Sequence, residues 1–251
     1  MPDVILGRVG KVATIRLARP PHNFFDAALL RSIADALDDN DADDAAVMTL
    51  MTAEGRSFCA GADFTASRGD GDAAADVYAQ AARIFDRRKP LIAAVGGPAV
   101  GGGLGLALAA DFRVVSTAAR FHANFAAIGL HPGFALTVTL PALIGAQAAR
   151  EMLMTARRVD GGEAVALRLA DQLVEPAALD EAALAFAETI AANAPLALRT
   201  IRRALPLIDG TAARAAMAAE LQAQASLFST ADFREGVAAG AERRPPVFVG
   251  R

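Results

Sequence analysis

The chain has 251 residues, of which 54% are hydrophobic and 21% charged, so it can form a globular protein of one large domain or one domain with a helical appendage. A formal net charge of -3 without a sustained basic block argues against nucleic-acid binding, and one cysteine excludes an internal disulfide. Three histidines without a neighbouring ligand motif argue against a metal site. The first residues lack the features of a signal peptide, and no apolar run could span a bilayer, so we expect a cytoplasmic protein without a membrane partner.

The N-terminal part of the chain predicts strands and one amphipathic helix. Residues 4–8 and 12–17 alternate apolar and polar side chains around a Gly-Lys turn, which indicates a β-hairpin. Two prolines make residues 19–25 a rigid turn, because they fix the backbone and lack an N–H donor. Asp26 is then expected to cap the N-terminus of a helix. Residues 47–52 form a further strand candidate.

The next segment turns sharply at Gly61, between small residues that allow a ligand to approach the backbone. Residues 65–76 contain few large apolar side chains and predict a mobile loop, followed by a helix over residues 77–87.

A stretch over residues 91–111 dominates the middle of the chain. Its apolar start, 91–95, predicts a buried strand, which is followed by a glycine-dense turn and then a helix of small residues. Bare backbone at the start of a helix offers unpaired N–H groups to an anion or a developing oxyanion. The alternative that the glycines only permit close packing stays open. The glycine spacing and the lack of a GK[ST] sequence argue against a nucleotide loop.

The remaining sequence predicts a strand-rich α/β core followed by a helical C-terminal third. The expected strands are 112–116, 120–122 and 171–175; residues 124–134 are irregular; helices are expected over 136–144 and 146–154 and from 179 onward, with breaks at Pro195, Pro206 and Gly210.

Two loops far apart in the sequence, Ser-Phe-Cys-Ala-Gly-Ala-Asp at 57–63 and Gly-Pro-Ala-Val-Gly-Gly-Gly at 97–103, together resemble those of the crotonase (enoyl-CoA hydratase/isomerase) superfamily. The turn at 19–23 ahead of them and the Ile-Gly-Leu-His-Pro-Gly segment behind them extend the resemblance to nearly the whole chain. It implies an α/β spiral of ββα units over residues 1–194. It also implies a helical trimerisation region over residues 195–251, with assembly as a homotrimer or a dimer of trimers.

The resemblance further implies that the ligand is an acyl-CoA thioester. Coenzyme A would then be part of the substrate, with no cofactor bound permanently. Backbone N–H groups of Ala62 and Gly102 would donate to the thioester oxygen and stabilise an enolate. The residues expected along the coenzyme A path are Ala60, Gly61, Asp63, Arg68 and His22.

The sequence departs from the family at the acidic positions. The two hydratase glutamates fall at Gly105 and Phe125, and the aspartate of some isomerases and a dehalogenase falls at Gly133. None of these residues can transfer a proton, so the resemblance supports thioester binding more than the addition of water. Isomerisation, decarboxylation and thioester hydrolysis stay open, as does an acyl-CoA-binding protein without catalytic activity.

Histidines are the remaining candidates for proton transfer. His131 lies in the segment that lines the acyl site of relatives, and an imidazole titrates in a useful range, so it is the predicted catalytic acid or base. His122 and Asn124 rank behind it. A lone histidine also commonly serves only to bind a backbone group, and that alternative stays open. Several aromatic residues are candidates for an apolar acyl pocket, namely Phe24, Phe25, Phe125 and Phe134.

Overall fold

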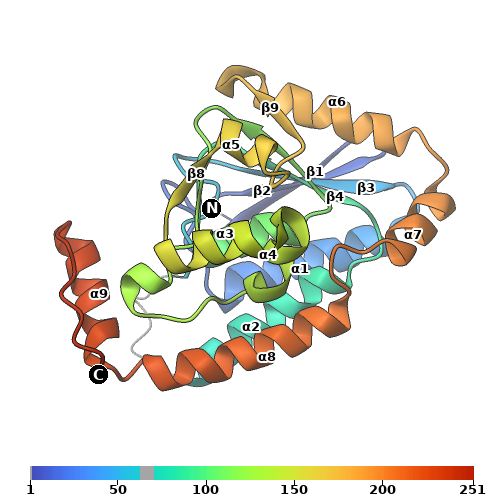
Figure 1. Cartoon of the computed structure of the whole chain (residues 1–251). Coiled ribbons are helices and arrows are strands. Elements are labelled where there is room, and N and C mark those ends of the chain that lie inside the picture. The colour runs from blue at the N-terminus through green and yellow to red at the C-terminus, as the bar shows by residue number, and fades with distance from the viewer. Residues whose placement is uncertain (1, 63–70) are drawn as a thin grey trace.

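The protein is built on a six-stranded sheet, shown in Figure 1 as a computed structural model that describes residues 2–62 and 71–251. The first two strands, β1 (Val4–Val9) and β2 (Val12–Leu17), form an antiparallel hairpin. The other neighbours pair in parallel, in the order β2-β3-β4-β6-β9. These further strands are β3 (Met48–Ala53), β4 (Leu91–Val95), β6 (Phe112–Ser116) and β9 (Gln172–Val174).

The middle strands are buried on both faces, and the side chains of successive residues pack into the two cores on opposite faces of the sheet. In β4, Ala93 and Val95 belong to the larger core, whereas Ile92 and Ala94 belong to the smaller one. Helix α6 (Leu179–Ala191) covers the smaller core on one face (Figure 1). Burial on both faces explains why the β4 sequence is apolar throughout. The opposite face carries α1 (Ala27–Ala42), α2 (Gly71–Asp86), α3 (Gly102–Ala109), α4 (Leu136–Thr155) and α8 (Gly210–Leu227).

A second, three-stranded sheet positions the loops of the candidate site. Its first two strands are parallel and its last two antiparallel. Two isolated bridges join further segments to this region, one between Cys59 and Ala99 and the other between Phe25 and Ala62. Segments distant in sequence therefore lie side by side here. The strands are β5 (Pro98–Val100), β7 (Arg120–His122) and β8 (Arg158–Asp160).

Shorter elements and the C-terminal helices complete the chain. Figure 1 shows α9 away from the sheet, and it packs against the 3-10 turn Ala126–Ile128. Among the described residues, no helix is both long and apolar enough to cross a bilayer. The remaining elements are α5 (Gly161–Ala166), the 3-10 turn Pro176–Ala178, α7 (Pro195–Ala204) and α9 (Ala231–Glu242).

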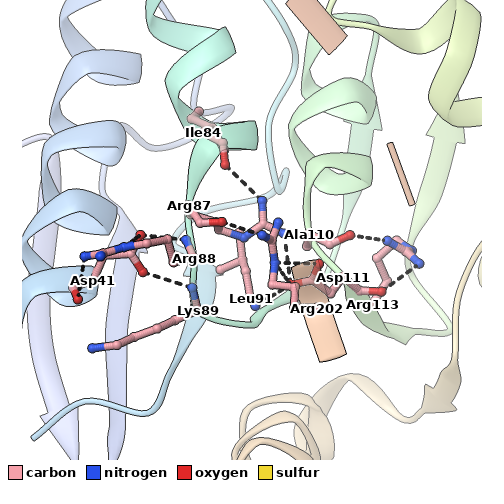
Figure 2. A network of polar contacts seen from close by, with 10 residues as sticks. All are labelled: Asp41, Ile84, Arg87, Arg88, Lys89, Leu91, Ala110, Asp111, Arg113 and Arg202. Carbon is pink, nitrogen blue, oxygen red and sulfur yellow. Dashed lines mark hydrogen bonds and ion pairs between the residues drawn. The ribbon is translucent and has the colours of Figure 1, made fainter. Parts of the chain in front are cut away.

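A buried polar network ties α7 to the sheet (Figure 2). The Asp111 carboxylate accepts hydrogen bonds from Leu91 N at 2.8 Å and Arg202 Nε at 3.1 Å, and pairs with the Arg87 guanidinium at 3.0 Å. Burial lowers the pKa of Arg87 to about 10, against the attraction of Asp111. Because all three charges are largely withdrawn from water, removing one would leave the others uncompensated.

Most of the expected elements are present. The hairpin is confirmed, and Asp26 caps α1 by accepting a hydrogen bond from Leu29 N at 2.8 Å. The two helices expected between residues 136 and 154 form α4, which kinks at Gly145 with φ 78°. The α/β class with C-terminal helices is confirmed, whereas the division at residue 194 stays a prediction.

Two expectations about local structure were wrong, and two short elements were not predicted. Residues 71–76, predicted as part of a mobile loop, begin α2; Asp76 in this turn binds Arg31 on α1 at 2.9 Å, a tertiary contact that sequence patterns do not show. Residues 98–100, predicted as part of a turn, form β5 because β7 provides a partner strand. The strand and helix over residues 158–166 were missed, since each is only a few residues long.

Candidate active site

The two glycine-containing loops lie against each other. Cys59 N donates to Pro98 O at 3.3 Å, and Val100 N donates to Cys59 O at 3.0 Å. On the other side of β5, Gly101 N donates to His122 O at 2.8 Å. The start of α3 is thereby held beside the turn that contains Gly61.

Glycine is required for this approach at two positions. A Cβ at Gly61, whose φ is +89°, would lie 2.8 Å from Val100 O and 3.4 Å from Gly102 N. A Cβ at Gly103 would lie only 2.0 Å from Cys59 O. Any side chain at either position would push the loops apart.

This approach puts the N–H of Gly102 beside the turn at Gly61, which Ala62 follows. Gly102 is the first residue of α3, so its N–H has no acceptor within the helix, and Gly101 ahead of it supplies no side-chain cap. Between the described residues, no hydrogen bond uses the N–H of Ala62 or of Gly102. Both residues line the same cavity. The pair offers two donors, with the positive end of the α3 dipole behind one of them.

Asn23 fastens the first loop to the preceding turn. Its side chain is fully buried, and its Nδ2 donates to Glu54 O at 2.7 Å and to Ser57 O at 2.8 Å. Its Oδ1 accepts from Arg19 N at 2.9 Å. A φ of 50° makes asparagine well suited to this position, since it tolerates the left-handed region better than most residues. The sequence analysis gave Asn23 no role, although a polar residue after two prolines is typical of such a turn.

The cavity in front of the N–H pair has a volume of about 1130 Å³. Its walls come from α1, α2, the two loops, the segment before α4, and α8 and α9. The side chains are largely apolar, which suits the acyl part of a ligand. The aromatic lining residues are Phe24, Phe25, Tyr78, Phe125, Phe134, Phe228 and Phe233.

Aromatic side chains fill the space beside Gly105 and Gly133, two of the positions where the family resemblance predicts acidic residues. A Cβ at Gly105 would lie 2.5 Å from Phe134 Cβ, and a Cβ at Gly133 would lie 2.3 Å from the Tyr78 hydroxyl. Phe125, at the third acidic position, itself lines the cavity. Phe134 and the hydroxyl of Tyr78 therefore occupy the volume that longer side chains at Gly105 and Gly133 would need.

Among the described lining residues, the two carboxylates form ion pairs at the rim of the cavity. Asp26 pairs with Arg19 at 2.9 Å and Asp76 with Arg31 at 2.9 Å, and their side chains are 58% and 44% exposed. Burial acts to raise the pKa of Asp26, but the Leu29 N–H and Arg19 more than offset it and lower the pKa. Both groups are therefore poor candidates for a base acting deep in the cavity.

Tyr78 and Gln224 form the polar part of the inner wall. The Tyr78 hydroxyl donates to Gln224 Oε1 at 2.9 Å, and Gln224 Nε2 donates to His131 O at 2.8 Å. Burial raises the pKa of Tyr78, and the charge of Glu220 adds to this shift. The phenol is thus neutral near pH 7. Tyr78, the only tyrosine in the chain, was not predicted as a site residue, because its position in a helix does not indicate what it faces.

Glu220 holds the segment that carries Phe134. Its buried carboxylate accepts from Ala135 N at 2.8 Å, Thr137 N at 3.0 Å and Thr137 Oγ1 at 2.6 Å. These bonds stabilise a backbone in which Phe134 and Ala135 both adopt left-handed conformations, with φ of 61° and 59°. Burial raises the pKa of Glu220 against these hydrogen bonds. The carboxylate thereby fixes the turn that directs the Phe134 ring toward Gly105.

The predicted site residues separate into three groups. Ala60, Gly61, Ala62 and Gly102 line the cavity together. Asp63 and Arg68 lie outside the described residues, as do residues 65–70 of the loop expected over 65–76.

Neither His22 nor His131 is part of the cavity lining. His22 Nδ1 lies 3.0 Å from Ser57 Oγ, and His131 Nδ1 lies 2.8 Å from Pro132 O. A catalytic role for His131 stays a prediction. Of the lower-ranked residues, Asn124 lines the cavity, whereas His122 Nε2 lies 2.9 Å from Ala156 O. Within the described part of the chain, no group of three or more His, Cys, Asp or Glu side chains could hold a metal ion.

The fold and the paired loops are those of the crotonase superfamily. The family model "Enoyl-CoA hydratase/isomerase" matches residues 7–251, and the chain belongs to this family of enzymes.

Known proteins are similar over nearly the whole chain. A putative enoyl-CoA hydratase of Thermus thermophilus is 35% identical over 248 residues, covering 95% of this chain and 98% of the relative. A carnitinyl-CoA dehydratase of Citrobacter koseri is 35% identical over 255 residues, with 97% of each chain covered. The crystal structure of an enoyl-CoA hydratase/isomerase from Pseudoalteromonas atlantica superposes with a TM-score of 0.89 at 29% identity, covering 99% of this chain and all of that one.

Proposed function

We propose that the protein binds an acyl-CoA thioester with the carbonyl oxygen between the N–H groups of Ala62 and Gly102, and stabilises the enolate that develops there. The observation that carries this proposal is the close contact of the two loops. A Cβ added at Gly61 would lie 2.8 Å from Val100 O and 3.4 Å from Gly102 N, so it would crowd the loop that leads into α3. Loss of one such donor costs about 2.7–4 kcal/mol of transition-state stabilisation in acyl-transfer enzymes. Two fixed donors therefore supply a large part of the catalysis.

Coenzyme A is proposed to enter as part of the substrate. The names of the similar proteins, an enoyl-CoA hydratase and a carnitinyl-CoA dehydratase, support a thioester ligand. A cavity of about 1130 Å³ is large enough for an acyl group together with part of the pantetheine arm. In this proposal Ala60 and Gly61 contact the ligand near the thioester, while the expected contributions of Asp63, Arg68 and His22 lie further along the coenzyme A.

The reaction we propose is not hydration by two carboxylates. Hydration of an enoyl thioester needs a base to activate water and an acid to protonate carbon. Gly105, Phe125 and Gly133 cannot supply these groups, and Phe134 and Tyr78 fill the space beside two of them. Enolate chemistry at the thioester is retained in this proposal, whereas rapid addition of water is not.

Two measurements test the proposal. A crystal structure with acetoacetyl-CoA is expected to place the thioester oxygen about 3 Å from both Ala62 N and Gly102 N. Hydration of crotonyl-CoA, followed by the loss of enoyl-thioester absorbance, is expected to be slow in a sample that binds coenzyme A by calorimetry. A thioester oxygen beyond hydrogen-bond distance of either nitrogen refutes the oxyanion site, and fast hydration refutes the assignment of the reaction.

A second candidate is acyl-CoA binding without turnover. The ion-paired carboxylates Asp26 and Asp76 at the rim favour it, because they leave the described inner wall without a carboxylate base. The bare N–H pair favours an enzyme, since binding alone does not require two unpaired donors at one oxygen. Turnover of any thioester at the cavity distinguishes these candidates.

The assembly we propose is a homotrimer or a dimer of trimers. Large apolar side chains on α7 and at its C-cap support self-association, since Leu196, Ile201 and Leu205 are 73%, 55% and 77% exposed in the single chain. Light scattering at several concentrations tests this, and a monomer throughout would contradict it.

A further inference from the structure

The ionisable residues that line the cavity occupy two different environments. Asp26, Arg31, Asp76 and Arg234 are at the rim, where the carboxylates are ion-paired and the arginines are exposed. Tyr78 is on the inner wall, next to Gly133 and Phe134. Among the described lining residues it is the one ionisable group placed beyond the rim.

The Tyr78 hydroxyl is oriented by Gln224, whose own orientation is fixed by a hydrogen bond to His131 O. Gln224 Nε2 is committed to His131 O, which leaves Gln224 Oε1 to accept the phenolic proton. Gly133 makes room for the hydroxyl, because a Cβ there would lie 2.3 Å from it. A rotation about the Cζ–Oη bond turns the proton from Gln224 to a ligand in the cavity without moving the ring.

The hydroxyl and the N–H pair flank the same aromatic ring. The Phe134 ring lies 3.7 Å from the place of a Cβ at Gly102, and its backbone adjoins Gly133, which the Tyr78 hydroxyl contacts. A ligand whose thioester oxygen is at the Gly102 N–H therefore has its acyl carbons along Phe134, on the way to Tyr78.

Within the described part of the inner wall, this arrangement contains an acid and holds no base. Burial raises the pKa of Tyr78, so the phenol keeps its proton near pH 7 and gives it up only to a strong base such as an enolate carbon. Isomerisation begins with removal of a proton, and thioester hydrolysis requires activation of water. Breaking a carbon–carbon bond to release carbon dioxide forms the same enolate and needs no base.

We propose that Tyr78 is the proton donor of a decarboxylation, and that the substrates are acyl-CoA thioesters with a carboxylate on the carbon next to the thioester carbonyl. This inference rests on the proposed function, because the enolate it invokes is held by Ala62 and Gly102.

The step balances without a cofactor or oxidant. The bond between the α-carbon and the carboxylate carbon breaks, and its electron pair forms the α-carbon to carbonyl-carbon double bond while the thioester oxygen takes the negative charge. Carbon dioxide leaves. Tyr78 then protonates the α-carbon, and the phenolate regains a proton from water, so each turnover consumes one proton.

The apolar lining of the cavity favours the loss of carbon dioxide. Phe25, Phe125 and Phe134 are nearly fully buried and surround the space where the substrate carboxylate would lie. A carboxylate loses its hydration there, whereas neutral carbon dioxide does not depend on hydration, so the apolar wall favours the product of bond cleavage.

The test supplies malonyl-, methylmalonyl- and ethylmalonyl-CoA to the full chain and measures carbon dioxide release and the acyl-CoA product. Release from at least one substrate is expected, and Tyr78→Phe is expected to slow it by roughly 10²–10⁴-fold, the range of general acid catalysis. In deuterated water the wild type should place one deuterium on one face of the α-carbon of the methylmalonyl-CoA product. The Phe variant should lose this facial selectivity, which a merely structural tyrosine would not control.

Controls separate the two proposals. Acetyl-CoA affinity of Tyr78→Phe should match the wild type, since the ring remains. Its melting temperature should fall by only a few degrees, because the variant lacks the hydrogen bond to Gln224 Oε1 but keeps the packing of the ring. Binding of acetyl-CoA without carbon dioxide release from any of the three substrates overturns the decarboxylation and leaves the oxyanion site standing. Absence of acyl-CoA binding overturns both. Equal rates and equal deuterium placement in the two proteins overturn the role of Tyr78.

Discussion

Replacement of Gly103 by alanine perturbs the contact between the loops without changing any residue that lines the cavity. The new Cβ would lie 2.0 Å from Cys59 O and 2.6 Å from the attached carbon, where real contacts are not shorter than about 3.0 Å. The start of α3 or the Cys59 segment must then move by about 1 Å, which stretches the bond from Val100 N to Cys59 O beyond its present 3.0 Å.

The expected magnitude follows from overpacking and a weakened hydrogen bond. Together they cost about 3 kcal/mol of the free energy of unfolding, a decrease of about 6–12 °C in melting temperature for a chain of this size. Because the Gly102 N–H moves with α3, a displacement of 1 Å is expected to slow any turnover at the site by about 10²-fold.

Thermal unfolding of Gly103→Ala measures the loss of stability, and the rate with an active thioester measures the loss of turnover. Calorimetry with acetoacetyl-CoA shows whether ligand affinity changes as well. Gly162→Ala is the matched control, because its Cβ would make an ordinary contact of 3.4 Å with the Asp160 carboxylate and lies within helix α5. This control should be as stable as the wild type or slightly more stable. Wild-type stability and thioester affinity in Gly103→Ala would refute the close packing on which the proposed oxyanion site depends.

Two further predictions concern the buried ion network and His131. Asp111→Asn is expected to lower the free energy of unfolding by about 3–5 kcal/mol at pH 7, because Arg87 and Arg202 lose their shared partner. Burial acts to raise the Asp111 pKa, but the two arginines more than offset it and hold it below the ordinary 3.8. The stabilisation is therefore present above pH 3.8 and is lost as the pH falls through the lower pKa of Asp111 in the folded state. Denaturant titrations should show the unfolding free energies of the wild type and the variant converging in acid. A difference between them that stays constant with pH would contradict this. For His131→Ala we expect nearly unchanged turnover of whichever thioester is active, because the ring is outside the cavity and contacts Pro132 O; a loss of roughly 10²-fold or more at constant coenzyme A affinity would restore His131 as the catalytic acid or base.

The sequence determined those features that depend on neighbouring residues. Alternation over residues 4–17 predicted the hairpin, and an aspartate before an apolar helical pattern predicted the α1 cap. The apolar run over β4 predicted a buried strand, since such a run has no solvent-facing side. The glycines around Gly61 and Gly101 indicated bare backbone, because glycine is favoured where φ is positive or another chain comes close.

The tertiary structure alone decided what surrounds that backbone. Tyr78 and Gln224 are 146 residues apart and meet at Gly133, and no local pattern in either helix indicates the other. Phe134 occupies the space beside Gly105 because Glu220, from a distant helix, holds the intervening backbone in a left-handed turn.

The same division explains the outcome for the candidate site. The loop residues Ala62 and Gly102 could be proposed from the resemblance of the two loops to those of the crotonase superfamily, and the small residues at both places suit backbone donors. The proposed proton donor Tyr78 could not be predicted in this way, because the packing of α2 against α8 brings its hydroxyl to the cavity. A catalytic role for His131 stays a prediction. Local sequence sets backbone geometry, whereas the chemistry of a pocket is set by contacts between elements that are distant along the chain.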